Sequence, residues 1–219
     1  SNGDYTLSDY SPAIGAGTAT GAPTTDINGN PRPTTNPDMG AYENDNDTPL
    51  HNSLIHVTTT GNDSGTVGLS AAPFKTIQAG IDYAADGDTV LVAAGTYTEN
   101  VSLNKSIVLM SSEGADSTII DANNFGTVVT ITDGSDATLD GFTLQNGYTS
   151  GSNTKSGGLI VLNNDAVIKN CIIKNNQGHQ GGGIYSQAGS FYNCQIIGNT
   201  AGFTGGGVEV NDIGGNSEY

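Results

Sequence analysis

The feature that most constrains the fold is a repeat of 24 residues near the carboxyl end of the sequence. Three similar segments recur at intervals of 24 residues: 158–160 (Gly-Leu-Ile), 182–184 (Gly-Gly-Ile) and 206–208 (Gly-Gly-Val). Between these marks, residues 169–176 (KNCIIKNN) resemble residues 192–199 (YNCQIIGN). A period in the low twenties, with short apolar runs and no helical spacing, is typical of a β-solenoid coil. One coil cannot bury its own apolar face, so the coils must stack.

From Thr89 onward the sequence alternates short apolar segments with corners rich in Gly, Asn and Asp. Period-two alternation between such corners predicts strands. Residues 89–219 are therefore expected to form about six coils, or roughly 25–30 Å of rod at the spacing of neighbouring strands.

Residues 55–88 predict a strand and a capping helix ahead of the coils. The strand begins at Ile55. A helical pattern follows Pro73 and is ended by residues 86–88 (Asp-Gly-Asp). Its apolar face comprises Phe74, Ile77, Ile81 and Ala84. One amphipathic helix directly before a solenoid is suited to cover the open end of its core.

The charge of the chain excludes several classes of partner. It has 6 Lys and Arg against 22 Asp and Glu, and a formal net charge of −16. Nucleic acid and anionic membrane surfaces require basic contacts, so neither is an expected partner. No apolar stretch reaches the length of a membrane span, and no signal peptide is expected at Ser1. The acidic surface is read as solubilising, with calcium-rich or saline surroundings as the alternative.

The two cysteines occupy equivalent places in successive repeats. Cys171 and Cys194 should therefore stack one strand above the other, with backbones about 4.8 Å apart. Direct stacking gives poor geometry for a disulfide. The pair is predicted to be a buried ladder of small apolar groups rather than a disulfide or a metal site.

Residues 1–43 form a block rich in Thr, Pro, Gly, Asn and Asp, and residues 44–54 resemble a linker. The block buries too little to fold without docking on a surface. Its apolar anchors are the predicted docking residues: Tyr5, Leu7, Tyr10, Ile14, Ile27, Met39 and Tyr42.

Two stretches resemble a known family. Residues 73–79 (PFKTIQA) and 88–97 (DTVLVAAGTY) resemble the amino-terminal cap and first coil of the pectate-lyase-like superfamily. The Gly-Gly-Gly-Ile and Asn-Cys-x-Ile units are similar to repeats of polymorphic-outer-membrane-protein-like surface proteins. The resemblance covers residues 55–210 and implies an all-β, right-handed parallel β-helix. It does not imply one activity, because this fold hosts lyases, hydrolases, adhesins and passive stalks.

The amino-terminal block carries a second resemblance. Residues 11–17 (SPAIGAG), 25–33 (TDINGNPRP) and 38–43 (DMGAYE) are similar to the segment that closes the carboxyl end of many bacterial secreted β-helix proteins. Here that segment comes first. The chain therefore resembles the end of one β-helix joined to the body of the next.

The residues suited to chemistry are few, and no enzyme is predicted. The single arginine, Arg32, lies between two prolines and is read as a clamp on a carboxylate or the backbone. His179 is expected in a solvated corner loop. Asp26, Asn28 and Asn30 occupy every second position, as the first ligands of a calcium-binding loop do, but no bidentate acid follows at the expected distance. An Asx-type turn is therefore preferred, with calcium as the weaker alternative and no other cofactor expected.

The two ends of the chain are the expected functional regions. Val208, Val210 and Ile213 should present an uncovered apolar coil, and residues 1–45 should need such a surface. The linker of eleven residues reaches about 35–40 Å at most, which makes docking within one chain strained. Docking on a neighbour, either a second copy or an adjacent module, would propagate head to tail.

The sequence thus predicts a structural subunit of an extracellular or cell-surface fibre, of bacterial origin. One alternative is an adhesin stalk that never polymerises. Another is a β-helix that binds surface glycans beside the loop 148–156 with exposed Tyr185 and Tyr192. A polysaccharide lyase or hydrolase ranks behind both.

Overall fold

The computed structural model describes residues 6–151, 155–163 and 165–211. The chain divides into two compact units, Ser1–Asn52 and Ser53–Tyr219. Tyr5 and Ile213, both predicted to take part in self-association, lie outside the described residues.

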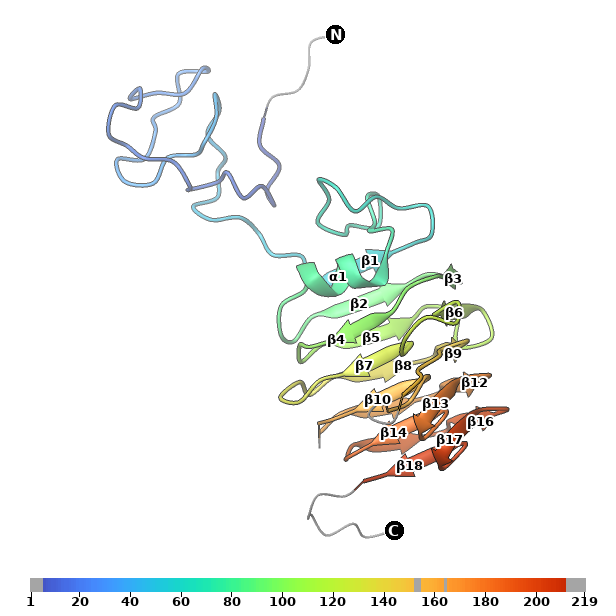
Figure 1. Cartoon of the computed structure of the whole chain (residues 1–219). Coiled ribbons are helices and arrows are strands. Elements are labelled where there is room, and N and C mark those ends of the chain that lie inside the picture. Colours follow the sequence, from blue (N-terminus) through green and yellow to red (C-terminus); the bar gives the residue numbers. More distant parts are fainter. Residues whose placement is uncertain (1–5, 152–154, 164, 212–219) are drawn as a thin grey trace. The chain divides into compact units, whose positions relative to one another are not determined.

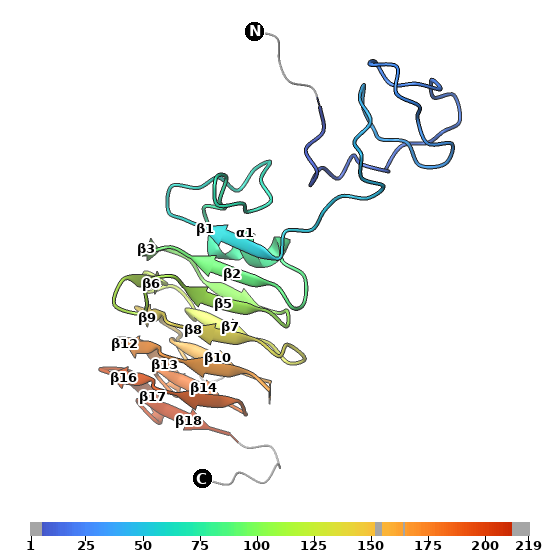
Figure 2. The ribbon, with the colours of Figure 1, turned by 180° about the vertical axis from the view of Figure 1, so that it is seen from behind.

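The second unit is a right-handed parallel β-helix, and its strands form three long sheets and one short sheet (Figures 1 and 2). The first sheet contains β1 (Leu54–Val57), β2 (Thr89–Val92), β5 (Val108–Ser111), β8 (Thr138–Asp140), β11 (Val167–Lys169) and β15 (Ser190–Tyr192). The second contains β4 (Val101–Leu103), β7 (Val129–Ile131), β10 (Leu159–Val161), β14 (Ile184–Ser186) and β18 (Val208–Val210). The third contains β3 (Gly95–Tyr97), β6 (Thr118–Asp121), β9 (Thr143–Gln145), β12 (Ile172–Lys174) and β16 (Gln195–Ile197). The short sheet pairs β13 (Gln177–Gln180) with β17 (Thr200–Thr204).

This arrangement confirms the predicted fold class. Every strand pair in the three long sheets is parallel, and each strand pairs with its equivalents in the next coils. Counted from Thr89, the described coils number five, and β1 adds the sixth rung of the first sheet. The 24-residue repeat corresponds to the last turns of this helix.

The corners between strands depend on Asn and Gly in a left-handed backbone conformation. Asn146 (φ 57°), Asn175 (φ 55°) and Gly198 (φ 64°) occupy this region in three successive coils. Asparagine tolerates it better than other residues with a side chain, because its short amide bonds locally. The Asn-rich composition is thus the consequence of a sharp turn that recurs in each coil.

One helix, α1 (Ile77–Tyr83), packs at the β1 end of the core (Figure 1). Thr76 is its N-cap and accepts a hydrogen bond from the Ala79 N–H at 3.2 Å. Ile77 and Ile81 are buried, and Phe74 and Ala84 join them in the same apolar core. The predicted apolar face of the helix is therefore the one that packs on the coils.

The first unit is built from turns rather than from an apolar core. Ile14 and Pro37 are its buried apolar side chains among the described residues. The two oxygens of the buried Asp38 accept hydrogen bonds from the Gly15 and Asn44 N–H groups, both at 2.7 Å. The Leu50 N–H also bonds back, to the Asp9 carbonyl at 2.7 Å. The stretch predicted as a linker therefore contributes to this unit as far as Leu50.

Candidate functional site

The strands contribute four long columns to the core of the β-helix, each a set of inward-facing residues at equivalent positions in successive coils. The first column runs through Ile55, Val90, Leu109, Leu139, Ile168 and Phe191. The second runs through Tyr97, Ile120, Leu144, Ile173 and Ile196. The third runs through Val101, Val129, Leu159, Ile184 and Val208. The fourth runs through Leu103, Ile131, Val161, Ser186 and Val210.

All four columns become exposed at the same coil. Every member before the last is at most 3% exposed. The last members are Phe191 at 36%, Ile196 at 37%, Val208 at 40% and Val210 at 52%. Each buried aliphatic or aromatic side chain contributes about 1.5–3 kcal/mol relative to its exposed state. A surface with four such residues, together with Cys194, is therefore suited to association; we call these five residues the open coil face.

The open coil face is hollow and predominantly apolar. A cavity of about 410 Å³ is lined by its five residues together with Ile184 and Asn193. Cys194 is the one ionisable side chain among them, and the others are apolar or neutral, so the surface favours a largely apolar cover. The strands that carry it, β15, β16 and β18, are the last strands of their sheets among the described residues, and Figure 2 shows β16 and β18 in the final coil.

Ladders of asparagine side chains also end at this coil. The Asn176 side chain accepts from the Gly147 N–H at 2.8 Å and donates to the Leu144 carbonyl at 3.1 Å. One coil later, the Asn199 amide accepts from the Asn176 N–H at 2.9 Å and donates to the Ile173 carbonyl at 2.8 Å. Each asparagine thus joins its coil to the preceding one, and Asn199 is the last rung among the described residues.

The two cysteines lie in the core between the first and third sheets, as their equivalent places predict. Cys171 is fully buried and Cys194 is half-buried on the open coil face. The contact with Cys194, followed by burial, raises the pKa of the Cys171 thiol. The hydrogen bond from Cys171 lowers the pKa of Cys194 to about 6. Cys194 is therefore the more reactive thiol, and it reports on access to this surface.

In the first unit, Arg32 fastens the turns together. One terminal guanidinium nitrogen forms an ion pair with Glu43 and donates to the Asp38 carbonyl at 3.3 Å. The other donates to the Gly40 carbonyl at 2.6 Å. This geometry agrees with the predicted role as a clamp on a carboxylate and on the backbone.

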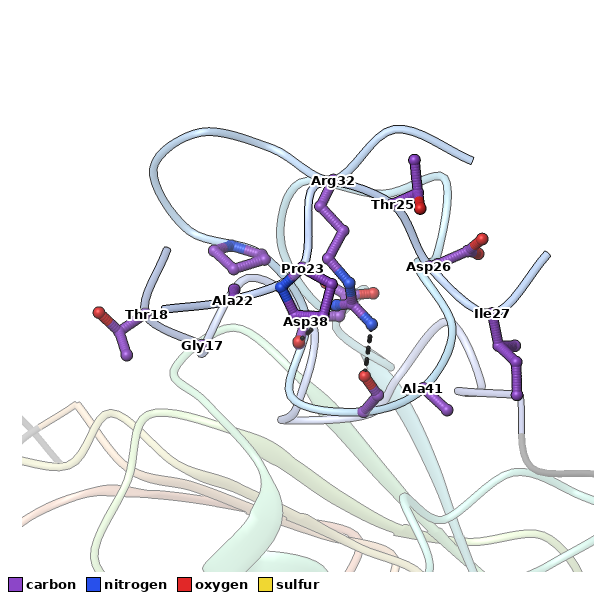
Figure 3. A pocket seen from close by; sticks show the side chains of 12 residues that line it. Gly17, Thr18, Ala22, Pro23, Thr25, Asp26, Ile27, Arg32, Asp38 and Ala41 are labelled. Carbon is purple, nitrogen blue, oxygen red and sulfur yellow. Dashed lines mark hydrogen bonds between the residues drawn. The ribbon is translucent and has the colours of Figure 1, made fainter. Parts of the chain in front are cut away.

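Arg32 also lines a cavity of about 470 Å³ within this unit. Figure 3 shows the side chain crossing the middle of the group, with Pro23 and Ala22 on one side and Thr25 and Asp26 on the other. Ile27 lies at its edge and is 67% exposed, and Met39 elsewhere in the unit is 62% exposed. Both are predicted docking residues, and both are accessible on the unit's surface.

The predicted calcium residues form an Asx turn. One oxygen of Asp26 accepts from the Asn28 and Asn30 N–H groups, both at 2.8 Å. The other accepts from the Asn30 side-chain amide at 3.1 Å and the Glu43 N–H at 3.3 Å. Burial acts to raise the pKa of Asp26, but these hydrogen bonds outweigh it and lower the pKa. The carboxylate is thus engaged by donors of the protein, which favours the turn over a metal ligand.

Two expectations about exposure are wrong. Ile14, predicted to dock on a neighbour, is buried inside its own unit because the surrounding turns close over it. Tyr185, predicted to be an exposed aromatic, is also buried: its hydroxyl accepts from the Asn211 amide at 2.9 Å, and the Lys155 ammonium lies 4.6 Å from its ring centre. Leu7, Tyr10 and Tyr42 are partly buried, whereas Tyr192 is exposed as expected.

The sequence reasoning missed three residues of the open coil face. Phe191, Cys194 and Ile196 join the predicted Val208 and Val210 there. The repeat contained the signal, because residues 192–199 align with residues 169–176. In this alignment, the buried Ile168 and Ile173 are equivalent to Phe191 and Ile196 of the next coil.

Other kinds of site find little support in the described part of the chain. No group of three or more His, Cys, Asp or Glu side chains is placed to hold a metal ion among residues 6–151, 155–163 and 165–211. Within the same residues, no helix has the length and apolar character that crossing a bilayer requires.

Comparisons with known proteins return two solved structures. They are pectin methylesterase from Aspergillus niger in its deglycosylated form, at 15% identity, and in a penultimately deglycosylated form, at 16% identity. Both have a TM-score of 0.39, and the match covers 67% of this chain. It covers 57% of the enzyme, so the chain spans little more than half of that protein. No protein-family model matches the sequence, and no curated protein matches it.

Proposed function

We propose that the protein is a non-catalytic structural module of an extracellular or cell-surface β-solenoid fibre. Modules join head to tail, with the first unit of one covering the open coil face of another. The neighbour is a second chain or an adjacent module of a longer polypeptide. Such a contact is heterologous, so it propagates into a filament rather than closing into a dimer.

The observation that carries this proposal is the simultaneous exposure of all four core columns at one coil. A scattered exposed apolar residue needs no explanation, but a contiguous apolar face with free strand edges does. The first unit supplies the complementary requirement, because it has little apolar core and exposes Ile27 and Met39. The resemblance of residues 1–43 to a closing segment supports the same pairing.

The test compares assembly of the whole chain with that of two altered forms. Deletion of residues 1–43 should abolish filaments in electron micrographs and shift the sedimentation of the protein to the monomer. Val208→Glu places a charge on the open coil face and should have the same effect. Ser102→Glu is the matched control, since Ser102 lies on a strand of the same sheet and faces solvent.

Filaments of normal length without residues 1–43 would refute the proposal. Measurements of turnover on a panel of plant and algal polysaccharides address the enzyme alternative directly. A fibre module should show none, and substrate-specific turnover would replace the proposed function with a catalytic one.

One observation favours a second function, the binding of surface glycans. Phe125, Tyr148 and Phe203 are exposed aromatics, and Phe203 stacks on His179 of the preceding coil with ring centres 5.4 Å apart. Bridges from Tyr148 to Gly126 and to Gln177 place these turns in one column. Aromatic faces are suited to the apolar faces of sugar rings. Saturable binding to a glycan array that is lost in Phe203→Ser would support this function; equal binding by both forms would exclude this surface.

A further inference from the structure

Cys171 and Cys194 are the only two cysteines of the chain, and the fold stacks one above the other. Directly after them, Ile172 pairs with Gln195, so the two cysteines hold equivalent places in neighbouring coils. The Gln195 N–H also donates to the Cys171 carbonyl at 2.9 Å, which fastens the two main chains together at this point. Neighbouring strands lie about 4.8 Å apart, and the Cα atoms of a disulfide are about 4.4–6.8 Å apart. The backbone is therefore already at disulfide distance.

The two thiols differ in their access to solvent. Cys171 is fully buried. Cys194 is half-buried and lines the hollow of about 410 Å³ on the open coil face. The two thiols are joined by a hydrogen bond, and both are free in this structure. A reagent that enters the hollow therefore meets Cys194 first, and Cys171 is the thiol that lies next to it.

We infer that Cys171 and Cys194 form a reversible redox pair, in which a low-molecular-weight disulfide oxidises the two thiols to a disulfide that links the last two described coils. The inference does not depend on the proposed function, because it requires neither the first unit nor a second copy. It assigns a modification site to the open coil face.

The reaction is a thiol–disulfide exchange in two steps. In the first, the Cys194 thiolate attacks one sulfur of the reagent, the sulfur–sulfur bond of the reagent breaks, and one thiolate leaves. In the second, the Cys171 thiol releases its proton to solvent and its sulfur attacks the Sγ of Cys194, so that the mixed disulfide breaks and the second thiolate leaves. Overall, the two protein thiols lose two electrons and two protons, and the reagent gains them as two thiols.

The acidity of the two thiols supports this order of events. The hydrogen bond from Cys171 lowers the pKa of Cys194 to about 6, so Cys194 is a thiolate at neutral pH and is the first nucleophile. The contact with Cys194, followed by burial, raises the pKa of Cys171. Modification of Cys194 removes the first of these two causes, because a mixed disulfide carries no charge on that sulfur. Cys171 thus becomes the more readily deprotonated once its neighbour has reacted.

The orientation of the side chains explains why the bond should be reversible. The Cys194 Sγ is 3.7 Å from the Ile168 carbonyl, and the Cys171 Sγ is 3.8 Å from the Leu139 carbonyl, each in the preceding coil. The two side chains are thus oriented alike and must turn toward each other to bond. Cys194 has room to turn because the hollow lies beside it. A disulfide closed in this way is strained, and strained disulfides are the more easily reduced.

The first experiment treats the whole chain with oxidised glutathione. The protein is dilute and is shown to be monomeric by sedimentation. Mass spectrometry should record the loss of the two thiol hydrogens, and peptide mapping without reductant should join the peptides that contain Cys171 and Cys194. A glutathione adduct that persists on the original chain, two free thiols, or a disulfide between two chains would each overturn the inference.

Single substitutions are the matched controls. In Cys171→Ala the glutathione adduct on Cys194 should persist, because the thiol that displaces it is missing. In Cys194→Ala the buried Cys171 should remain a free thiol. An adduct on Cys171 in the folded Cys194→Ala chain would show that the buried thiol is attacked directly, and would overturn the proposed order.

An equilibrium measurement on the unaltered chain tests whether the fold favours the bond. The ratio of disulfide to dithiol is titrated with mixtures of reduced and oxidised glutathione, once in buffer and once in urea that unfolds the chain. In the unfolded chain the two thiols meet with an effective concentration in the millimolar range. The equilibrium constant for disulfide formation should be about tenfold higher in the folded chain, and by linkage the disulfide should favour the folded state by the same factor. A constant that is equal or lower in the folded chain would show that the stacked geometry opposes the bond, and would refute the inference.

Discussion

The coil of β8 to β10 and the coil of β15 to β18 are built alike but differ in their surroundings. Leu139, Leu144 and Leu159 of the inner coil are fully buried. Phe191, Ile196 and Val208 hold the equivalent positions in the outer coil, and all three are exposed. The strand registers are the same, so the difference comes from the number of neighbouring coils. An apolar residue of a solenoid is a core residue only when a further coil, or a cap such as α1, covers it.

The sharpest test of this comparison truncates one column at two places. Leu139→Ala should lower the free energy of unfolding by about 3 kcal/mol, because it leaves a cavity between two coils. Phe191→Ala should cost less than about 1.5 kcal/mol in the monomer, since its ring already contacts water. Urea unfolding of dilute protein measures both. Equal losses would mean that the outer coil is covered in solution.

The asparagine ladder offers a second matched pair. Asn176→Ala should destabilise the protein by about 2 kcal/mol, because it leaves the buried Gly147 N–H and Leu144 carbonyl without that partner. Asn199→Ala should cost about 1 kcal/mol, since water can replace its bonds at the open end. Thermal unfolding at low concentration gives both values. A larger loss of stability for Asn199→Ala than for Asn176→Ala would contradict the view that the last rung of the ladder is solvated.

The third test uses the reactivity of Cys194. Its lowered pKa of about 6 means that the thiolate predominates at pH 7, so alkylation by iodoacetamide should rise with pH around 6 rather than around 8.5. Cys171→Ala removes the hydrogen bond, raises the pKa of Cys194, and should slow alkylation at pH 7 on the order of tenfold. Mass spectrometry follows the reaction. An unchanged rate would show that the neighbouring thiol does not activate Cys194.

The smallest expected effect serves as the control for the whole comparison. Tyr192 lies on the same strand as Phe191 but is exposed on the outer side. Tyr192→Ser should change the free energy of unfolding by less than about 0.5 kcal/mol and leave self-association unaltered. Equilibrium sedimentation and urea unfolding check the two parts. A marked loss of association would extend the docking surface beyond the open coil face.

The repeat made much of the fold predictable. The repeat of Gly182-Gly183-Ile184 correctly predicted that β18 follows β14 at a step of 24 residues. For β10 the step is wrong by one residue, because Leu159 rather than Ile160 pairs with Ile184. The apolar face of α1 followed from the spacing of Ile77 and Ile81. Such features depend on local periodicity, which a single sequence displays. The exposed Ile27 and Met39 were identified from the same reasoning, since a segment so poor in apolar residues cannot bury all of them.

The misplaced residues depended on contacts between distant segments. Tyr185 is buried because Asn211 and Lys155, both far from it in the sequence, close around its ring and hydroxyl. Ile14 is buried by turns whose order is set by Asp38 and Asn44. No periodic pattern records such contacts, so exposure at these sites could not be predicted.

The sequence by itself determined the coil period, the alternation of inward and outward side chains, and the acidic surface with little attraction for polyanions. Local backbone preference and apolar spacing are sufficient for these properties. The tertiary structure alone decided which members of each column are covered, and that Arg32 retains a buried donor beside a cavity. Burial and hydrogen-bond satisfaction depend on all residues that lie nearby in space. The sequence shows directly only which residues are neighbours along the chain.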